Sequence, residues 1–191
     1  MSSRLSLALI AVLGSSAAVA EDSTPAWVDQ AQSKAGALGS QLQQALQAAI
    51  AEGGPVAGID VCRIQAPVIA RNVSNQEVQV GRTSLKIRNP DNTPDSWEAR
   101  VLEDFERRLA AGEAPGQIET FAIRNDGERR FGHWMKAIPT QGLCTVCHGT
   151  DIPEEIAEAI NNAYPDDQAH GYSAGELRGA FSVQVKLENG R

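Results

Sequence analysis

Cysteine and aromatic residues are scarce in this sequence. Three of its 191 residues are cysteines and 5% are aromatic, which excludes a small domain held together by many disulfides. Basic residues number 17 against 24 acidic ones, for a formal net charge of −7, and this balance argues against a nucleic acid as partner. Beyond residue 20 no apolar run is long enough to cross a bilayer, so we expect no membrane span in the mature chain.

The first twenty residues have the pattern of a secretory signal peptide. Arg4 supplies the positive start, Leu5–Leu13 is a short uncharged apolar run, and Ala18-Val19-Ala20 is the small-x-small pattern that signal peptidase cleaves. An uncleaved membrane anchor is the alternative, but the apolar run is too short to span a bilayer. We therefore expect cleavage after Ala20, a periplasmic location, and a single mature domain over residues 21–191.

Hydrophobic residues at three- and four-residue steps predict a helix over Trp27–Ala51. Gly53-Gly54-Pro55 ends this helix and starts another, which carries Cys62 on its inward face. Pro67 removes a backbone donor from the second helix, so we expect a kink or break near residues 63–66. Cys62 therefore lies just before an expected distortion.

Short strands and helices alternate in the rest of the chain. A strand is predicted over Glu77–Arg88, and a helix begins with Thr93 as N-cap and Pro94 at its first position and ends at Gly112. Further expected elements are strands over Gln117–Arg124, Glu128–Ile138 and Leu177–Leu187, a hairpin turn at Asp126-Gly127, and a short helix opened by Pro153. This order predicts an α+β fold with helices on one face of an antiparallel sheet, and it lacks the βαβ pattern of dinucleotide-binding folds.

Cys144-Thr145-Val146-Cys147-His148 is a C-x-x-C-H segment, the attachment signature of c-type haem. Two cysteines three residues apart can each form a thioether with one of the two vinyl groups along one porphyrin edge. His148 then projects beneath the ring and can bind the iron as proximal ligand. Because haem is attached outside the cytoplasm, the signal peptide agrees with this interpretation. We therefore expect one covalent haem c on Cys144 and Cys147.

Three other interpretations of the C-x-x-C-H segment compete with haem attachment. A zinc site needs a fourth ligand, and the sequence has no second C-x-x-C pair. A thioredoxin-like redox pair belongs in a βαβ context that is missing here. A structural disulfide between Cys144 and Cys147 is the third alternative.

Cys62 is left over if a haem uses the other two cysteines. It is either a buried, inert thiol or a thiolate that binds the haem iron as its sixth ligand. The rival ligands are Met135, His133 and His170. Residue types alone rank Met135 first, because histidine–methionine ligation is common in electron-transfer cytochromes.

Several segments of the mature chain resemble a family of exported c-type haem domains of unknown function. The run Gly81-Arg82-Thr83-Ser84-Leu85-Lys86-Ile87-Arg88-Asn89-Pro90 carries most of this resemblance and is far more specific than C-x-x-C-H alone. The other matching segments are Cys62–Ala70, Met135–Pro139, Cys144–Gly149, Gly171-Tyr172 and Arg178–Ser182.

The resemblance implies a PAS-like arrangement of sheet and helices, which occurs alone or ahead of kinase and cyclase signalling modules. It also implies that a histidine and a cysteine bind the haem iron, with Cys62 at the position of the family's cysteine. This implication moves Cys62 ahead of Met135 as sixth ligand, and an open or labile position ranks behind both.

Arg82, Lys86 and Arg88 alternate on one side of the strand predicted over residues 77–88. Arginine is suited to bidentate contact with carboxylates, so these side chains are candidates to bind the haem propionates. A solvated strand face is the alternative.

Together these features predict a periplasmic monohaem c-type protein that acts in redox or small-ligand sensing, or in redox partnering. No kinase or membrane helix follows the domain in this sequence, so we expect a separate redox or signalling protein as partner. The first alternative is a simple electron-transfer cytochrome c with His/Met ligation. A haem peroxidase-like enzyme is least favoured, because no further acid–base pair stands out.

Overall fold

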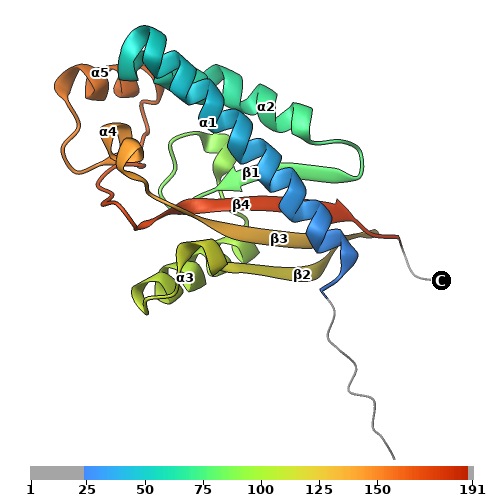
Figure 1. Cartoon of the computed structure of the whole chain (residues 1–191). Helices are drawn as coiled ribbons and strands as arrows, with labels where there is room; N and C mark the ends of the chain where they lie inside the picture. Colours follow the sequence, from blue (N-terminus) through green and yellow to red (C-terminus); the bar gives the residue numbers. More distant parts are fainter. Residues whose placement is uncertain (1–23, 189–191) are drawn as a thin grey trace, which may run out of the picture.

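Four antiparallel strands form one sheet, and helices pack against it (Figure 1). The computed structural model describes residues 24–188, so the predicted signal peptide over residues 1–20 lies outside the described residues. The elements are α1 (Ala26–Asp60), α2 (Ala66–Val73), β1 (Val78–Thr83), α3 (Ser96–Ala110), β2 (Glu119–Asp126), β3 (Arg129–Pro139), α4 (Thr145–His148), α5 (Glu154–Ala163) and β4 (Leu177–Lys186). The predicted PAS-like α+β class, an antiparallel sheet with flanking helices, is confirmed.

The strand order in the sheet is β1-β4-β3-β2, and every neighbouring pair is antiparallel. β2 and β3 form the predicted hairpin, whose turn contains Gly127 at a φ of 58°, a conformation that glycine adopts without strain. The last strand, β4, lies between β1 and β3 and thereby joins the first strand to the hairpin.

Helices cover both faces of the sheet. Trp134 on β3 is fully buried on the α1 side, where it packs with Val28 and Leu38. Its neighbour Met135 points to the opposite face and packs with Phe105 of α3. In Figure 1, α1 crosses in front of the strands, and α3 lies on the lower side of β3. The expectation of helices on one face is therefore wrong, because the apolar stripe of α3 buries the second face.

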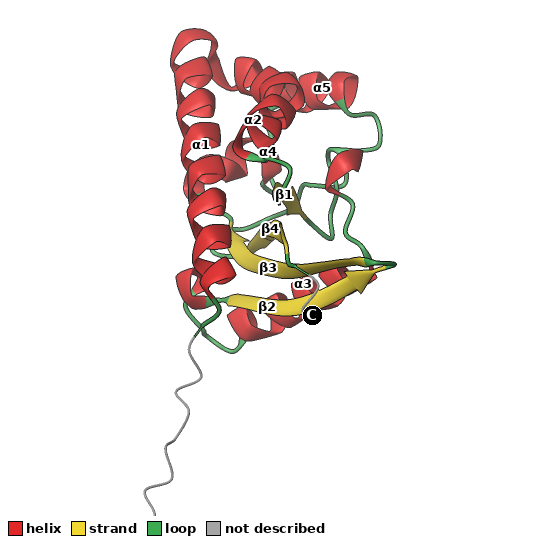
Figure 2. Ribbon diagram, turned by 90° about the vertical axis from the view of Figure 1, so that its right-hand side faces the viewer, coloured by secondary structure: helices red, strands yellow, loops and turns green. Residues whose placement is uncertain are grey.

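The predicted interruptions of the first helical region are present. Gly53 and Gly54 leave helical geometry, with Gly54 at a φ of 72°, and Pro55 follows. A π-helical turn over Val61–Gln65 then separates α1 from α2, which confirms the distortion expected beside Cys62. In Figure 2, α1 runs from the sheet up to the level of α4 and α5, so this distorted turn lies beyond the end of the sheet.

The N-terminus of α3 differs from the prediction by two residues. Asp95, and not Thr93, is the N-cap: its side chain accepts hydrogen bonds from the backbone N–H groups of Trp97 and Glu98, and Glu98 accepts one from the Asp95 N–H. This capping box satisfies donors at both ends of the turn. The Thr93 hydroxyl instead donates to the carbonyl O of Pro90.

The first strand is shorter than predicted. β1 ends at Thr83, because the carbonyl O of Asn92 accepts hydrogen bonds from the Thr83 hydroxyl and the Ser84 N–H and draws the chain into a loop. Lys86 and Arg88 lie on this loop, so the expectation that they share a strand face with Arg82 is wrong. Among residues 24–188, none of the helices combines the length and apolar character needed to cross a membrane.

Candidate functional site

A cavity of about 240 Å³ lies where the C-terminal part of α1, the end of β1 and the C-x-x-C-H segment meet. Cys62, Cys144, Cys147 and His148 all line it. Aliphatic side chains, among them Ile50 and Ile59, cover much of the remaining wall. Apolar walls with a few polar groups are typical of ligand sites, and here they bring Cys62 to the same space as a segment far away in the sequence.

The C-x-x-C-H segment is a single helical turn. A 3-10 turn over Gly142–Cys144 leads directly into α4, which ends at His148. Gly149 follows, and a Cβ atom at this position would clash with the carbonyl O of Thr145, so the close turn requires glycine. All three cysteines are free, half-buried thiols, and none is used in a disulfide. Burial raises the pKa of Cys147, although the charge of Arg88 opposes this shift.

His148 is held in one tautomer by the loop that follows α5. Its Nδ1 lies 2.6 Å from the carbonyl O of Ala169, and a carbonyl only accepts, so Nδ1 carries the proton. Burial lowers the pKa of His148 to about 3, and the positive charges of Arg178 and Arg88 contribute to the lowering. The imidazole is therefore neutral with a free Nε2 lone pair, the form that binds a metal.

Basic side chains surround the cavity. Its lining includes Arg82, Lys86, Arg88 and Arg178 and no acidic residue. Burial lowers the pKa of Arg82 and of Arg178, yet arginine stays protonated in proteins. Lys86 is exposed at the rim, with its Nζ 4.8 Å from the centre of the Tyr172 ring. An anionic ligand suits this cavity.

Arg88 differs from the other cations because it is already paired. Its Nε and Nη2 each donate to the Asp167 carboxylate at 2.9 Å, and the two side chains are only 8% and 6% exposed. Nη2 also donates to the carbonyl O of Cys147 at 2.7 Å. The guanidinium of Arg88 is thus engaged within the protein, unlike Arg82, for which no ion pair is found among residues 24–188.

The rival ligands do not reach the cavity. Met135 and His133 are fully buried on the α3 side of the sheet. His170 is exposed and does not line the cavity. The structure therefore brings Cys62, and none of its three rivals, to the C-x-x-C-H segment.

The structure lacks the geometry that a zinc site or a thioredoxin-like redox pair would need at the C-x-x-C-H segment. Within residues 24–188, no group of three or more histidine, cysteine or acidic side chains is arranged to hold a metal ion directly. The segment follows a strand of an antiparallel sheet, and not the first strand of a βαβ unit.

Three lining or supporting residues were missed by sequence reasoning: Arg178, Asp167 and Tyr164. Arg178 lies inside one of the segments that carry the family resemblance, which was a signal for it. Asp167 had none, because its role depends on a partner 79 residues away. Burial raises the pKa of Tyr164 to about 12, so its hydroxyl stays neutral against the cavity.

One family model and one solved structure match this chain. A family model described as Tll0287-like matches residues 16–186 of the chain. Among solved structures, the crystal structure of the cyanobacterial heme-protein Tll0287 matches with a TM-score of 0.61 and 23% sequence identity, over 88% of this chain and 100% of that chain. At this identity the match shows a shared fold. A search of curated proteins finds no match.

Proposed function

Because the chain belongs to the Tll0287-like family, we propose that it binds haem in the cavity lined by Cys62 and the C-x-x-C-H segment. The solved structure that shares its fold is described as a heme-protein. The observation that carries the proposal is the convergence of three free cysteines and a neutral, oriented histidine on one cavity. A single covalent haem c accounts for all four side chains.

Each of these side chains has a distinct role in the proposed site. Cys144 and Cys147 would form the two thioethers, and Nε2 of His148 would bind the iron. The Cys62 thiolate would be the second protein ligand of the iron. Bound haem supplies a one-electron couple and a coordination position for a small ligand.

The cations of the cavity fit the two haem propionates. Arg82 and Arg178 are half-buried, with no acidic residue beside them in the lining, and Lys86 is exposed at the rim. Burial lowers the pKa of both arginines, so two carboxylates at this place would compensate their charge and stabilise the protein. Arg88 has Asp167 for a partner and is not needed for this role.

We propose a periplasmic protein in which this haem serves redox or small-ligand sensing, or redox partnering. Ferric iron in the dianionic porphyrin has one net positive charge, which a thiolate neutralises. Ferrous iron would have no such net charge, so it would hold the Cys62 thiolate less strongly than ferric iron would. Cys62 lies on a π-helical turn, and such turns recur at functional sites.

Covalent attachment is tested by producing the full-length protein with a cytochrome c maturation system. The haem should stay with the protein through acid–acetone extraction. The double variant Cys144→Ala, Cys147→Ala should lose it, while Cys62→Ser should keep it, because Cys62 forms no thioether. Haem that is extracted from the unaltered protein would refute the proposal.

The sensing role is tested separately with carbon monoxide. We expect slow or partial binding to the ferrous protein, because reduction weakens the iron–thiolate bond. No binding over hours would instead support an electron carrier that keeps six ligands in both oxidation states.

A further inference from the structure

The Arg88–Asp167 ion pair connects the C-x-x-C-H segment to the loop over residues 165–172. Asp167 Oδ1 accepts a hydrogen bond from the backbone N–H of Ala169 at 3.0 Å. Arg88 Nη2 lies 3.3 Å from the carbonyl O of the same residue and 2.7 Å from the carbonyl O of Cys147. The ion pair therefore fixes the N–H of Ala169 through Asp167, and Arg88 adds a longer, shared contact to its C=O.

The Ala169 carbonyl is also the acceptor for Nδ1 of His148, at 2.6 Å. Ala169 is fully buried, so water has no access to replace this carbonyl. Three backbone hydrogen bonds also hold this loop. Gly171 N–H donates to the Gly149 carbonyl and Tyr172 N–H to the His148 carbonyl, each at 2.9 Å, and Gln168 N–H donates to the Ile87 carbonyl at 2.8 Å. None of them contacts the imidazole, whose Nδ1 hydrogen bond goes to the Ala169 carbonyl.

We propose that Arg88 and Asp167 are positioning residues for the iron ligand His148. They hold the Ala169 carbonyl against Nδ1 and so set how strongly the imidazole donates electrons to the haem iron. This inference rests on the proposed function, and it assigns Arg88 a role other than propionate binding.

The physical basis is the hydrogen bond on the far nitrogen of a metal-bound imidazole. Such a bond fixes the ring and the tautomer and raises the basicity of the ligating nitrogen, and a more basic ligand stabilises ferric over ferrous iron. Bidentate arginine–carboxylate pairs have a narrowly defined geometry. The buried Arg88–Asp167 pair therefore constrains the position of the Ala169 carbonyl in addition to the backbone hydrogen bonds of the loop.

The ion pair is also electrically neutral, so neutralising Arg88 and neutralising Asp167 change the charge beside the haem in opposite directions. In Arg88→Gln the Asp167 carboxylate is left beside the haem, so the ferric state is favoured and the midpoint potential should fall. In Asp167→Asn the Arg88 guanidinium is left, so the potential should rise. The variant Arg88→Lys keeps the charge but cannot make the bidentate contact, so the Ala169 carbonyl is loosened and the midpoint potential should rise.

The double variant Arg88→Gln, Asp167→Asn separates positioning from charge. It leaves no net charge but loosens the Ala169 carbonyl, so His148 donates less and the midpoint potential should rise above that of the unaltered protein. The Nδ1 proton of His148 should also exchange faster with solvent, as measured by NMR on the low-spin protein. A double variant with the unaltered potential and exchange rate would overturn the positioning role.

Spectroelectrochemical titration of the purified holoprotein provides the potentials, with Arg108→Gln as control. Arg108 Nη2 lies 2.6 Å from Glu113 Oε1, and neither residue lines the cavity. The loss of the Arg108 charge should therefore leave the midpoint potential unchanged. If the double variant does not fold, Arg88→Lys still tests the inference, because it keeps the positive charge and removes the bidentate contact. An Arg88→Lys protein with the unaltered potential would contradict the inference. Acid–acetone extraction of the unaltered protein tests the proposed function independently. If the haem is retained there and the variants do not shift the potential as expected, the positioning role fails while the proposed function stands.

Discussion

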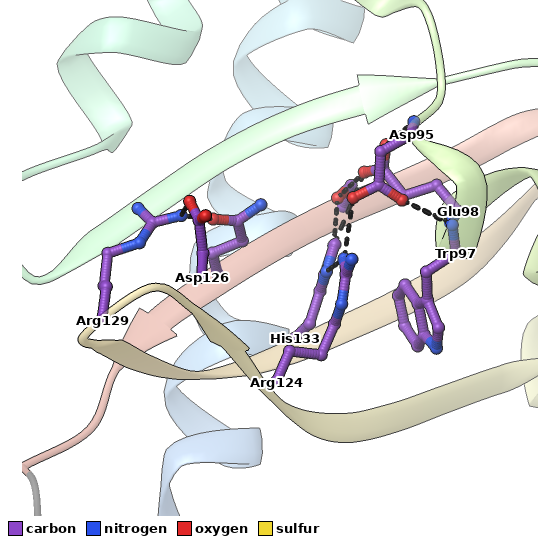
Figure 3. Close-up of polar contacts among 9 residues, drawn as sticks. Asp95, Trp97, Glu98, Arg124, Asp126, Arg129 and His133 are labelled. Atoms are coloured by element: carbon purple, nitrogen blue, oxygen red, sulfur yellow. Dashed lines mark hydrogen bonds and ion pairs between the residues drawn. The ribbon is translucent and has the colours of Figure 1, made fainter.

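Glu98 connects α3 to the sheet, and its replacement by glutamine should destabilise the fold measurably. Figure 3 shows Glu98, Asp95, Arg124 and His133 converging between α3 and the strands. Glu98 Oε1 accepts from the Ser182 hydroxyl at 2.6 Å, and Oε2 accepts from the Asp95 N–H at 2.8 Å. Because that hydroxyl proton is used, Ser182 Oγ accepts from Nε2 of His133.

Glutamine keeps the size of the side chain but turns one acceptor oxygen into a donor. In Glu98→Gln, one of the two hydrogen bonds to the carboxylate is therefore lost and an N–H group faces another donor. A hydrogen bond to a charged group contributes about 1.5–3 kcal/mol. We expect the free energy of unfolding at pH 7, measured by urea titration with circular dichroism, to fall by that amount.

The size of this effect should depend on pH. Burial alone would raise the pKa of Glu98, but hydrogen bonds from His133, Ser182 and the Asp95 N–H lower it below the ordinary value of 4.5. The stabilisation by the carboxylate is therefore complete above that ordinary value and is lost as the pH falls through the lower, folded-state pKa. The difference between unaltered protein and variant should shrink in acid.

The control is Glu106→Gln, at an exposed position of the same helix. Its effect should stay within about 0.5 kcal/mol, as for other surface substitutions. A Glu98→Gln difference as small as this, or one that is equal at pH 7 and in acid, would refute the reasoning.

Three further outcomes follow from the cavity and the N-terminus. Arg82→Gln should lower the midpoint potential of the holoprotein in a redox titration, because it removes a positive charge that lines the proposed haem cavity; an unchanged potential would remove Arg82 from the site. Gly149→Ala should reduce the yield of covalently attached haem, measured by absorbance after extraction, because its Cβ would clash with the Thr145 carbonyl; a normal yield would show that the turn tolerates a side chain. N-terminal sequencing of the exported protein should begin at Glu21, and a retained Met1 would contradict cleavage.

The sequence predicted local features well where one short segment determines them. The apolar stripe and Pro67 placed Cys62 on an inward face at a distortion, and Asp126-Gly127 predicted the hairpin. Predictions failed where a contact with a residue outside the segment determines its structure. The alternation of residues 77–88 suggested a long strand, but the Asn92 carbonyl ends β1 at Thr83.

The residues that support the candidate site could not be predicted either, because their roles depend on contacts between segments far apart in the sequence. Arg88 was predicted as one of three similar cations, because spacing does not reveal a partner. Its pairing with Asp167 depends on how the loop after α5 folds back onto the C-x-x-C-H segment. Arg178 likewise faces the cavity only because β4 lies next to β1.

Ligation of the ferric haem by Cys62 is the central claim, and electron paramagnetic resonance of the ferric protein tests it most directly. We expect a low-spin thiolate signal that Cys62→Ser abolishes and Met135→Leu leaves intact, since Met135 is buried in the α3-side core and does not line the cavity. A signal that survives Cys62→Ser and disappears in Met135→Leu would contradict the account and identify a His/Met electron carrier.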